Sequence, residues 1–164
     1  MLCTGRRDQG SNTAYNPCTT EEWKKLLGRP PQLLVVEDNG GILSCVMEWF
    51  ESDGWVVEGV EDGSAFFERI EPAISDVDFD LEYDCIVTDI MMPGIDVISI
   101  LEGLRTTGCD VPIAVISAMP DPILPQRIFQ LGNAEFFRKP FVISELYERM
   151  STLLRCSLDG RTIH

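Results

Sequence analysis

The stretch DCIVTD at residues 84–89 decides the fold class, because an almost continuous apolar run ends in a carboxylate. Such a run is typical of a strand that is buried on both faces of a parallel sheet. A different pattern follows, in which Val97, Leu101 and Leu104 recur at helical spacing until Gly108. We therefore predict a buried strand followed by a helix that packs on the same sheet.

The same alternation extends in both directions from this stretch. Further strands are expected at residues 33–36, 55–59, 111–117 and 135–138, and further helices at 42–53, 62–74, 123–131 and 146–154. Parallel strands need crossover helices, and a parallel sheet is covered on both faces. The predicted fold class is therefore α/β, a flavodoxin-like (βα)5 fold with a five-stranded parallel sheet and helices on both faces.

The pattern divides the chain into three parts. Residues 32–155 form the predicted domain, residues 1–31 an N-terminal extension, and residues 156–164 a C-terminal tail. Within the extension, the spacing from Thr19 to Glu22 predicts a capping box for a short amphipathic helix near 19–27. The sequence leaves open whether Trp23 of this helix packs on the domain or on a partner.

Composition narrows the function classes. The chain has 27 acidic and 13 basic side chains and a formal charge of -14, which argues against direct binding to nucleic acid or anionic membranes. Apolar runs are far shorter than the roughly 20 residues of a membrane span, and we expect a cytoplasmic protein. The 6 cysteines form no CxxC pair, so they are read as reduced and not as zinc ligands.

Polar side chains stand where the predicted strands end. The first strand runs into Glu37 and Asp38, the third ends in Asp89, the fourth ends in Ser117, and the fifth runs into Lys139. In open α/β sheets the ligand site lies at the carboxyl ends of the strands. We therefore expect these side chains to converge on one site.

This set of side chains suits phosphoryl transfer. Clustered carboxylates repel one another unless a cation offsets them, and oxygen ligands with open water positions suit Mg²⁺. With Mg²⁺ and Lys139 neutralising the phosphoryl oxygens, a carboxylate can act as nucleophile. Asp89 is the best-placed candidate, and its product would be an aspartyl phosphate.

Four motifs carry a resemblance to a known family. In their order and spacing they resemble the response-regulator receiver family of two-component signalling, over roughly residues 32–155. They are VVEDN (35–39), DCIVTDIMMPG (84–94), VISA (115–118) and FFRKPF (136–141). One departure is Val97, where the family usually has glycine, but it removes no functional group.

The resemblance implies a phosphoacceptor and a metal site. Asp89 matches the phosphoacceptor. The Mg²⁺ ligands would be Asp38, Asp89 and the backbone carbonyl of Met91, with Glu37 acting through water.

The resemblance also implies a phosphoryl-binding set and a switch. Ser117, the N–H of Ala118 and Lys139 would bind the phosphoryl group. Ser117 and Phe136 would form the switch, although the neighbouring Phe137 makes the register uncertain by one residue. Pro140 would follow a cis peptide bond.

In function, the resemblance implies a switch within a phosphorelay. A sensor histidine kinase or a histidine phosphotransfer protein would phosphorylate Asp89. The signal would pass to a downstream protein partner or a homodimer through the face of the fourth helix, fifth strand and fifth helix of the domain. We expect no output domain in this chain, and no enzymatic activity beyond its own phosphorylation and dephosphorylation.

Two other functions stay open. The chain could be a binding module that is never phosphorylated, although the acidic, hydroxyl and lysine side chains that phosphorylation needs are all present. It could also be an aspartate-nucleophile phosphatase of the haloacid dehalogenase type, but that class needs a second aspartate where Met91 stands. Residues 76–82 begin like a calcium loop, yet they lack the glycine and the final glutamate that an EF-hand requires, so they are read as a solvated acidic loop.

Overall fold

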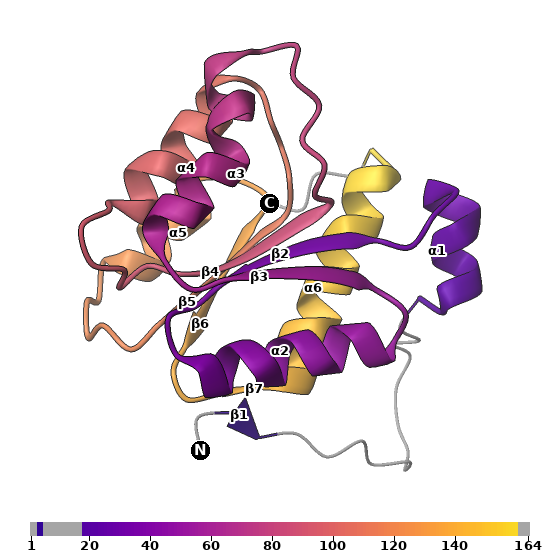
Figure 1. The fold of residues 1–164 in the computed structure, drawn as a ribbon, viewed down its shortest axis with the longest axis horizontal. Coiled ribbons are helices and arrows are strands. Elements are labelled where there is room, and N and C mark those ends of the chain that lie inside the picture. The colour runs from indigo at the N-terminus through magenta and orange to yellow at the C-terminus, as the bar shows by residue number, and fades with distance from the viewer. Residues whose placement is uncertain (1–2, 5–17, 161–164) are drawn as a thin grey trace.

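The computed structural model of this chain describes residues 3–4 and 18–160. Its centre is a parallel five-stranded sheet in the order β3-β2-β4-β5-β6 (Figure 1). The strands are β2 (Gln32–Val36), β3 (Val56–Val60), β4 (Cys85–Asp89), β5 (Ile113–Ser117) and β6 (Ala134–Arg138). This order and the parallel pairing confirm the predicted fold class.

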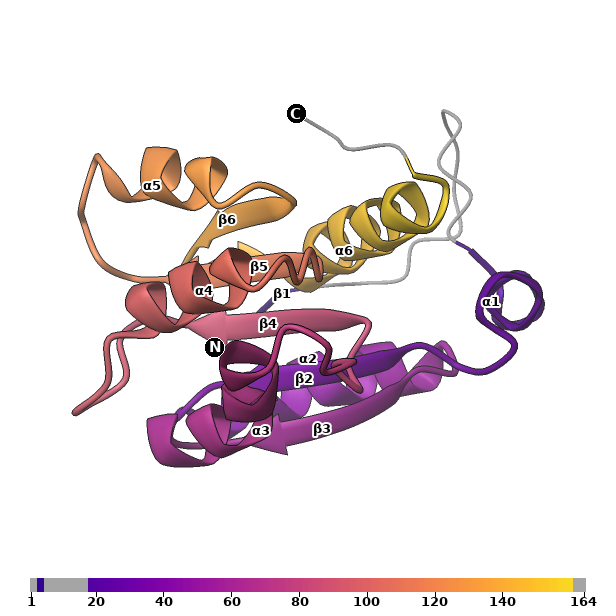
Figure 2. The same ribbon diagram turned by 90° about the horizontal axis from the view of Figure 1, so that it is seen from above.

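Helices cover both faces of the sheet (Figures 1 and 2). One face carries α2 (Gly40–Ser52) and α6 (Ile143–Leu158), and the other carries α3 (Gly63–Ser75), α4 (Val97–Thr106) and α5 (Leu124–Gln130). Every residue of β4 and β5 is buried. That burial explains why both strands read as continuous apolar runs rather than as alternating ones.

Side-chain caps fix where the helices begin at the carboxyl edge of the sheet. Asn39, Asp62 and Asp96 each accept hydrogen bonds from backbone N–H groups in the first turn of α2, α3 and α4. Such caps satisfy donors that have no partner inside the helix. The loops that follow β2 and β4, and that carry Glu37, Asp38 and Met91, are therefore held at the helix as well as at the strand.

The predicted N-terminal helix is present as α1 (Thr20–Leu27). Its capping box pairs Thr19 with Glu22 in both directions. Trp23 is fully buried and meets Trp55 edge to face, with 5.6 Å between ring centroids. Trp23 therefore packs on the domain itself, which answers the question that the sequence left open.

Several elements begin or end at residues that differ from the sequence-based bounds. β5 begins at Ile113 rather than at residue 111, since Pro112 has no N–H to donate to the ladder. β4 ends at Asp89, as expected, but begins at Cys85 rather than at residue 84. α6 continues to Leu158, so residues 156–158 of the predicted tail are helical.

Two further features complete the architecture. A short parallel pairing joins β1 (Cys3–Thr4) to β7 (Phe141–Val142), and no sequence pattern predicted it. Residues 5–17 of the predicted extension and 161–164 of the predicted tail lie outside the described residues. Within the described part of the chain, no helix has both the length and the apolar character that crossing a membrane requires.

Candidate functional site

The fold brings the predicted site residues to one edge of the sheet. Because the strands are parallel and in register, their carboxyl ends lie side by side. Glu37 and Asp38 follow β2, Asp89 and Ser117 end β4 and β5, and Lys139 follows β6. The expectation that these residues gather at the carboxyl edge is met by the geometry.

Lys139 lies between two buried carboxylates. Its Nζ is 2.5 Å from Asp89 Oδ2 and 2.8 Å from Glu37 Oε2. The three side chains are only 8%, 5% and 0% exposed, respectively. Ion pairs so shielded from water interact far more strongly than surface pairs, and each charge depends on the others for compensation.

Burial and ion pairing have opposite effects on the pKa of Glu37 and on the pKa of Lys139. Burial raises the pKa of Glu37 above its ordinary value of 4.5, and this outweighs the lowering by Lys139 and by the Asn39 N–H. Burial alone would lower the pKa of Lys139, but hydrogen bonds to Asp89 and Glu37 together raise it. Lys139 is therefore a firmly held cation, and Glu37 is protonated more easily than an ordinary glutamate.

Two backbone N–H groups orient the carboxylates. The N–H of Met91 donates to Asp89 Oδ1 at 2.7 Å, and the N–H of Asn39 donates to Glu37 Oε1 at 3.0 Å. Sequence reasoning missed both donors. No side-chain pattern could reveal them, because every residue except proline carries the same N–H group.

The carboxylates also form a candidate metal site. One oxygen each from Glu37, Asp38 and Asp89 lies within 4.8 Å of the others. Among residues 3–4 and 18–160, this is the one such group that could hold a metal ion. Asp38 is exposed, so water can complete the coordination. An all-oxygen donor set with open positions fits Mg²⁺.

Ser117 and Ala118 lie at the end of β5, beside this group. Ser117 is fully buried, and its Oγ accepts a hydrogen bond of 3.0 Å from the Met119 N–H. The hydroxyl proton is thus free to be donated to another acceptor. The backbone carbonyl of Ser117 accepts from the Lys139 N–H at 2.9 Å, and the Lys139–Pro140 bond is cis, as the resemblance implied.

The alternation of β6 separates its two phenylalanines. Phe137 is buried with the core on the α2 and α6 face. Phe136 is partly buried and packs on the opposite face, with the core under α3, α4 and α5. The structure therefore shows that Phe136 and Phe137 lie on opposite faces of the sheet, while the switch role of Phe136 stays a prediction.

Comparison with known proteins identifies the family. The family model of the response regulator receiver domain matches residues 33–151 of the sequence, so the chain belongs to the response regulator receiver family. It is 33% identical over 128 residues to the response regulator MprA of Mycolicibacterium vanbaalenii, covering 77% of this chain and 51% of that protein. MprA of Mycobacterium ulcerans is likewise 33% identical over 126 residues, covering 76% of this chain and 50% of that protein. The chain spans about half the length of these curated relatives.

Solved structures agree with this assignment. The receiver domain of Francisella response regulator 1452 is similar with a TM-score of 0.65 and 29% identity, over 77% of this chain and 98% of that one. The non-phosphorylated HemR receiver domain of Leptospira biflexa has a TM-score of 0.60 and 26% identity, over 76% of this chain and 94% of that one. The chain is thus a receiver domain of the kind found in two-component response regulators.

Proposed function

We propose that Asp89 accepts a phosphoryl group from a sensor histidine kinase or a histidine phosphotransfer protein in the cytoplasm. The observation that carries this proposal is the position of the Asp89 carboxylate, 2.5 Å from Lys139 and within the cluster that it forms with Glu37 and Asp38. A buried carboxylate with a fixed cation beside it is suited to attack at phosphorus.

The transfer is a displacement at phosphorus. A carboxylate oxygen of Asp89 forms the new O–P bond while the P–N bond of the donor phosphohistidine breaks, and its electron pair returns to the imidazole. The Asp89 carboxylate needs no base, because it carries no proton to lose when ionised. Lys139 stays protonated throughout and neutralises the charge on the phosphoryl oxygens.

We assign the metal ligands to Glu37, Asp38, Asp89 and the backbone carbonyl of Met91. Mg²⁺, when bound, neutralises charge on the phosphoryl oxygens and on the carboxylates that surround them. Asp38 is the exposed member of the cluster, and Glu37 is the fully buried member, whose charge Lys139 offsets. We therefore give direct coordination to Asp38 and a supporting, water-mediated role to Glu37.

The readout begins at Ser117 and ends on the surface. The Ser117 hydroxyl and the N–H of Ala118 would bind the transferred group, and the Ser117 movement would change the packing of Phe136. The signal would then reach a protein partner or a second copy through the face of α5, β6 and α6. On this face Phe129 and Ile123 are 65% and 60% exposed, which supports a contact surface.

Intact-mass measurement after incubation with Mg²⁺ and acetyl phosphate tests the proposal. The wild-type chain should gain the mass of one phosphoryl group, and Asp89→Asn should gain none. Glu61→Gln removes an exposed carboxylate outside the cluster and should behave like the wild type. If the wild type gains no mass under conditions that phosphorylate another receiver, the chain is a binding module that is never phosphorylated.

A further inference from the structure

A groove lies between α3 and α4, which run side by side on one face of the sheet (Figure 1). It has a volume of about 440 Å³. Its walls are the start of α3 (64–68), the loop before α4 (94–96) and Ile100. We call it the α3–α4 groove. None of the proposed phosphorylation-site residues lines it.

Two close contacts between the helices lie at the ends of this groove. Near the carboxyl edge of the sheet, Ile95 packs so tightly on Gly63 that a Cβ added to that glycine would lie 2.8 Å from the Ile95 Cγ2. Toward the opposite edge, Ile74 packs on Gly103, where an added Cβ would lie 3.5 Å from the Ile74 Cγ2. Close-packed contacts of this kind hold the two helices at a fixed spacing. The groove between them is therefore already formed when a partner arrives.

The walls of the groove are apolar and incompletely covered. Phe67 is 41% exposed, and Ile95 and Ile100 are only partly buried. All three side chains line the groove. Covering such a surface with another apolar side chain is favourable, and an exposed apolar patch of this kind is typical of a site that contacts another protein. Because the helices meet at both ends, the groove suits a single inserted side chain better than an extended segment.

The charges around the groove indicate the character of that partner. Among the described residues that line it, Glu68 and Asp96 are acidic and none is basic. Hydrogen bonds from Ser99 lower the pKa of Asp96, so this carboxylate stays ionised. The Glu68 side chain is 72% exposed and lies 3.8 Å from Arg69, whose Nε is held at 2.6 Å by Glu58. Charge complementarity therefore favours a basic partner.

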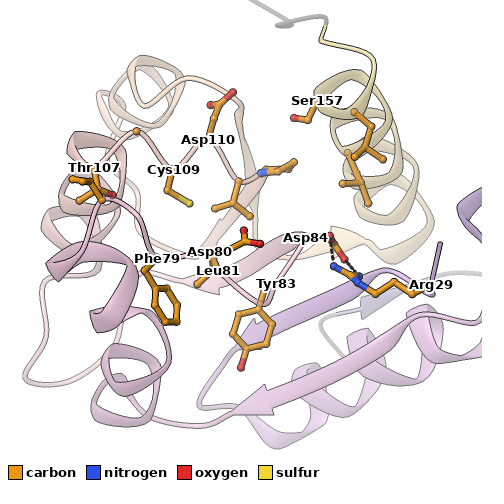
Figure 3. A pocket seen from close by; sticks show the side chains of 16 residues that line it. Arg29, Phe79, Asp80, Leu81, Tyr83, Asp84, Thr107, Cys109, Asp110 and Ser157 are labelled. Carbon is orange, nitrogen blue, oxygen red and sulfur yellow. Dashed lines mark hydrogen bonds and ion pairs between the residues drawn. The ribbon is translucent and has the colours of Figure 1, made fainter. Parts of the chain in front are cut away.

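The hollow at the amino edge of the sheet, where β4 and β5 begin, is different (Figure 3). It has a volume of about 490 Å³ and is lined largely by loops. There the guanidinium of Arg29 donates two hydrogen bonds to Asp84, at 2.6 and 3.1 Å. The walls of that hollow supply their own cation, whereas the described walls of the α3–α4 groove supply none.

We propose that the α3–α4 groove binds an apolar side chain of about leucine size from a basic segment of a partner protein. The inserted side chain lies between Phe67 and Ile100, and the basic residues beside it lie near Glu68 and Asp96. A second copy of this chain fits less well, because it would bring its own carboxylates to the same rim. Binding needs no phosphoryl group on Asp89, so this proposal stands or falls apart from the proposed function.

Titration of the ¹⁵N-labelled, unphosphorylated chain with a basic amphipathic peptide tests the proposal. The probe is N-acetyl-Lys-Leu-Leu-Lys-Lys-Leu-Leu-Lys-amide, and the matched control replaces each leucine by alanine, which keeps the charge but shortens the apolar side chains. We expect amide shifts at Phe67, Gly94 and Ile100, and binding about tenfold weaker for the alanine peptide. Equal binding of the two peptides, no binding, or shifts confined to the amino-edge hollow or to other surfaces would overturn the proposal.

Substitutions assign the contact to the groove. Phe67→Ser should weaken binding of the leucine peptide about tenfold, whereas Phe129→Ser, at a side chain of α5 that is 65% exposed, should change it less than about twofold. Glu68→Gln should weaken it about threefold, and Glu48→Gln on the exposed side of α2 should not. The amide spectrum of each variant reports its folding.

Two results with these variants would count against the partner segment. Equal losses in Phe67→Ser and Phe129→Ser would reduce the effect to general hydrophobic attraction. A homodimer that forms with rising protein concentration and that Phe67→Ser abolishes would show that a second copy occupies the groove. Either result would overturn the proposal.

Discussion

The two edges of the sheet each hold a close contact between a cation and a carboxylate, yet the contacts differ in burial. At the carboxyl edge, Lys139 lies 2.5 Å from Asp89, and the side chains are 8% and 5% exposed. At the amino edge, Arg29 lies 2.6 Å from Asp84, and the side chains are 45% and 12% exposed. The distances are nearly equal, so distance does not separate the two pairs, whereas burial does.

The difference in burial indicates which of the two ion pairs can support phosphoryl transfer. A buried charge must be compensated by its neighbours, and the compensation holds every group in place before a substrate arrives. An exposed pair is screened by water and contributes little to stability. We therefore expect changes at the carboxyl edge to have large effects, and changes to the charges of the amino edge to have small ones.

The largest effect is expected from Lys139→Ala. It leaves Glu37 and Asp89 buried without a cation, and we expect a loss of about 3–5 kcal/mol in the free energy of unfolding when Mg²⁺ is absent. Urea denaturation measures this loss, and Lys25→Ala on the exposed side of α1 is the control. Added Mg²⁺ should reduce the loss, because a metal ion replaces the missing positive charge. A loss below about 1 kcal/mol would contradict the account of the site.

The second effect concerns what holds the amino edge together. Trp23 is fully buried, so Trp23→Ala should cost about 3–5 kcal/mol in the free energy of unfolding. Leu26→Ala, on the same helix at a side chain that is 42% exposed, should cost less than about 1 kcal/mol. Denaturation midpoints of the two variants give the comparison. If the two losses were equal, α1 would not be anchored through Trp23.

The third effect is a pH dependence of metal binding. Protonation of Glu37 removes a negative charge from the Mg²⁺ site, and burial holds the pKa of Glu37 above 4.5. The apparent Mg²⁺ affinity should therefore fall as pH falls through that raised pKa, by up to about tenfold per pH unit. Calorimetric titration between about pH 7.5 and pH 5 measures it. Glu37→Gln should flatten the profile, and an unchanged profile in that variant would assign the proton to another group.

The smallest effect is expected from Arg29→Ala. The pair with Asp84 is partly solvated, so its loss should cost less than about 1 kcal/mol in the free energy of unfolding. Salt should shrink this cost further, since exposed charges are screened. Thermal unfolding at low and high salt measures both. A loss as large as that of Lys139→Ala would remove the contrast between the two edges.

Periodicity made most of the fold predictable from sequence. Residues 85–89 have the pattern of a buried strand and form one, and the carboxyl ends of the strands place Asp38, Asp89 and Lys139 at one edge of the sheet. What sequence could not supply was the difference between adjacent acids: Glu37 is fully buried and paired with Lys139, while Asp38 is exposed. That difference depends on how neighbouring loops pack, which no local pattern encodes.

The amino edge was less predictable for the same reason. The helix of Trp23 was expected from its capping box, but its docking against Trp55 requires a long-range aromatic contact. A pocket at this edge is lined largely by loops without period, and one of them includes residues of the stretch 76–82, which the sequence predicted to be a solvated acidic loop. Only the packing of the end of α6 against these loops makes a pocket of them.

The central claim is that Asp89 carries the phosphoryl group, and locating the group tests it most directly. Borohydride reduces an acyl phosphate to an alcohol, so treatment of the phosphorylated chain followed by peptide mass spectrometry reveals the modified residue. We expect reduction at Asp89 alone. Reduction at Asp38 or at another carboxylate, with Asp89 intact, would contradict the assignment of the phosphoacceptor.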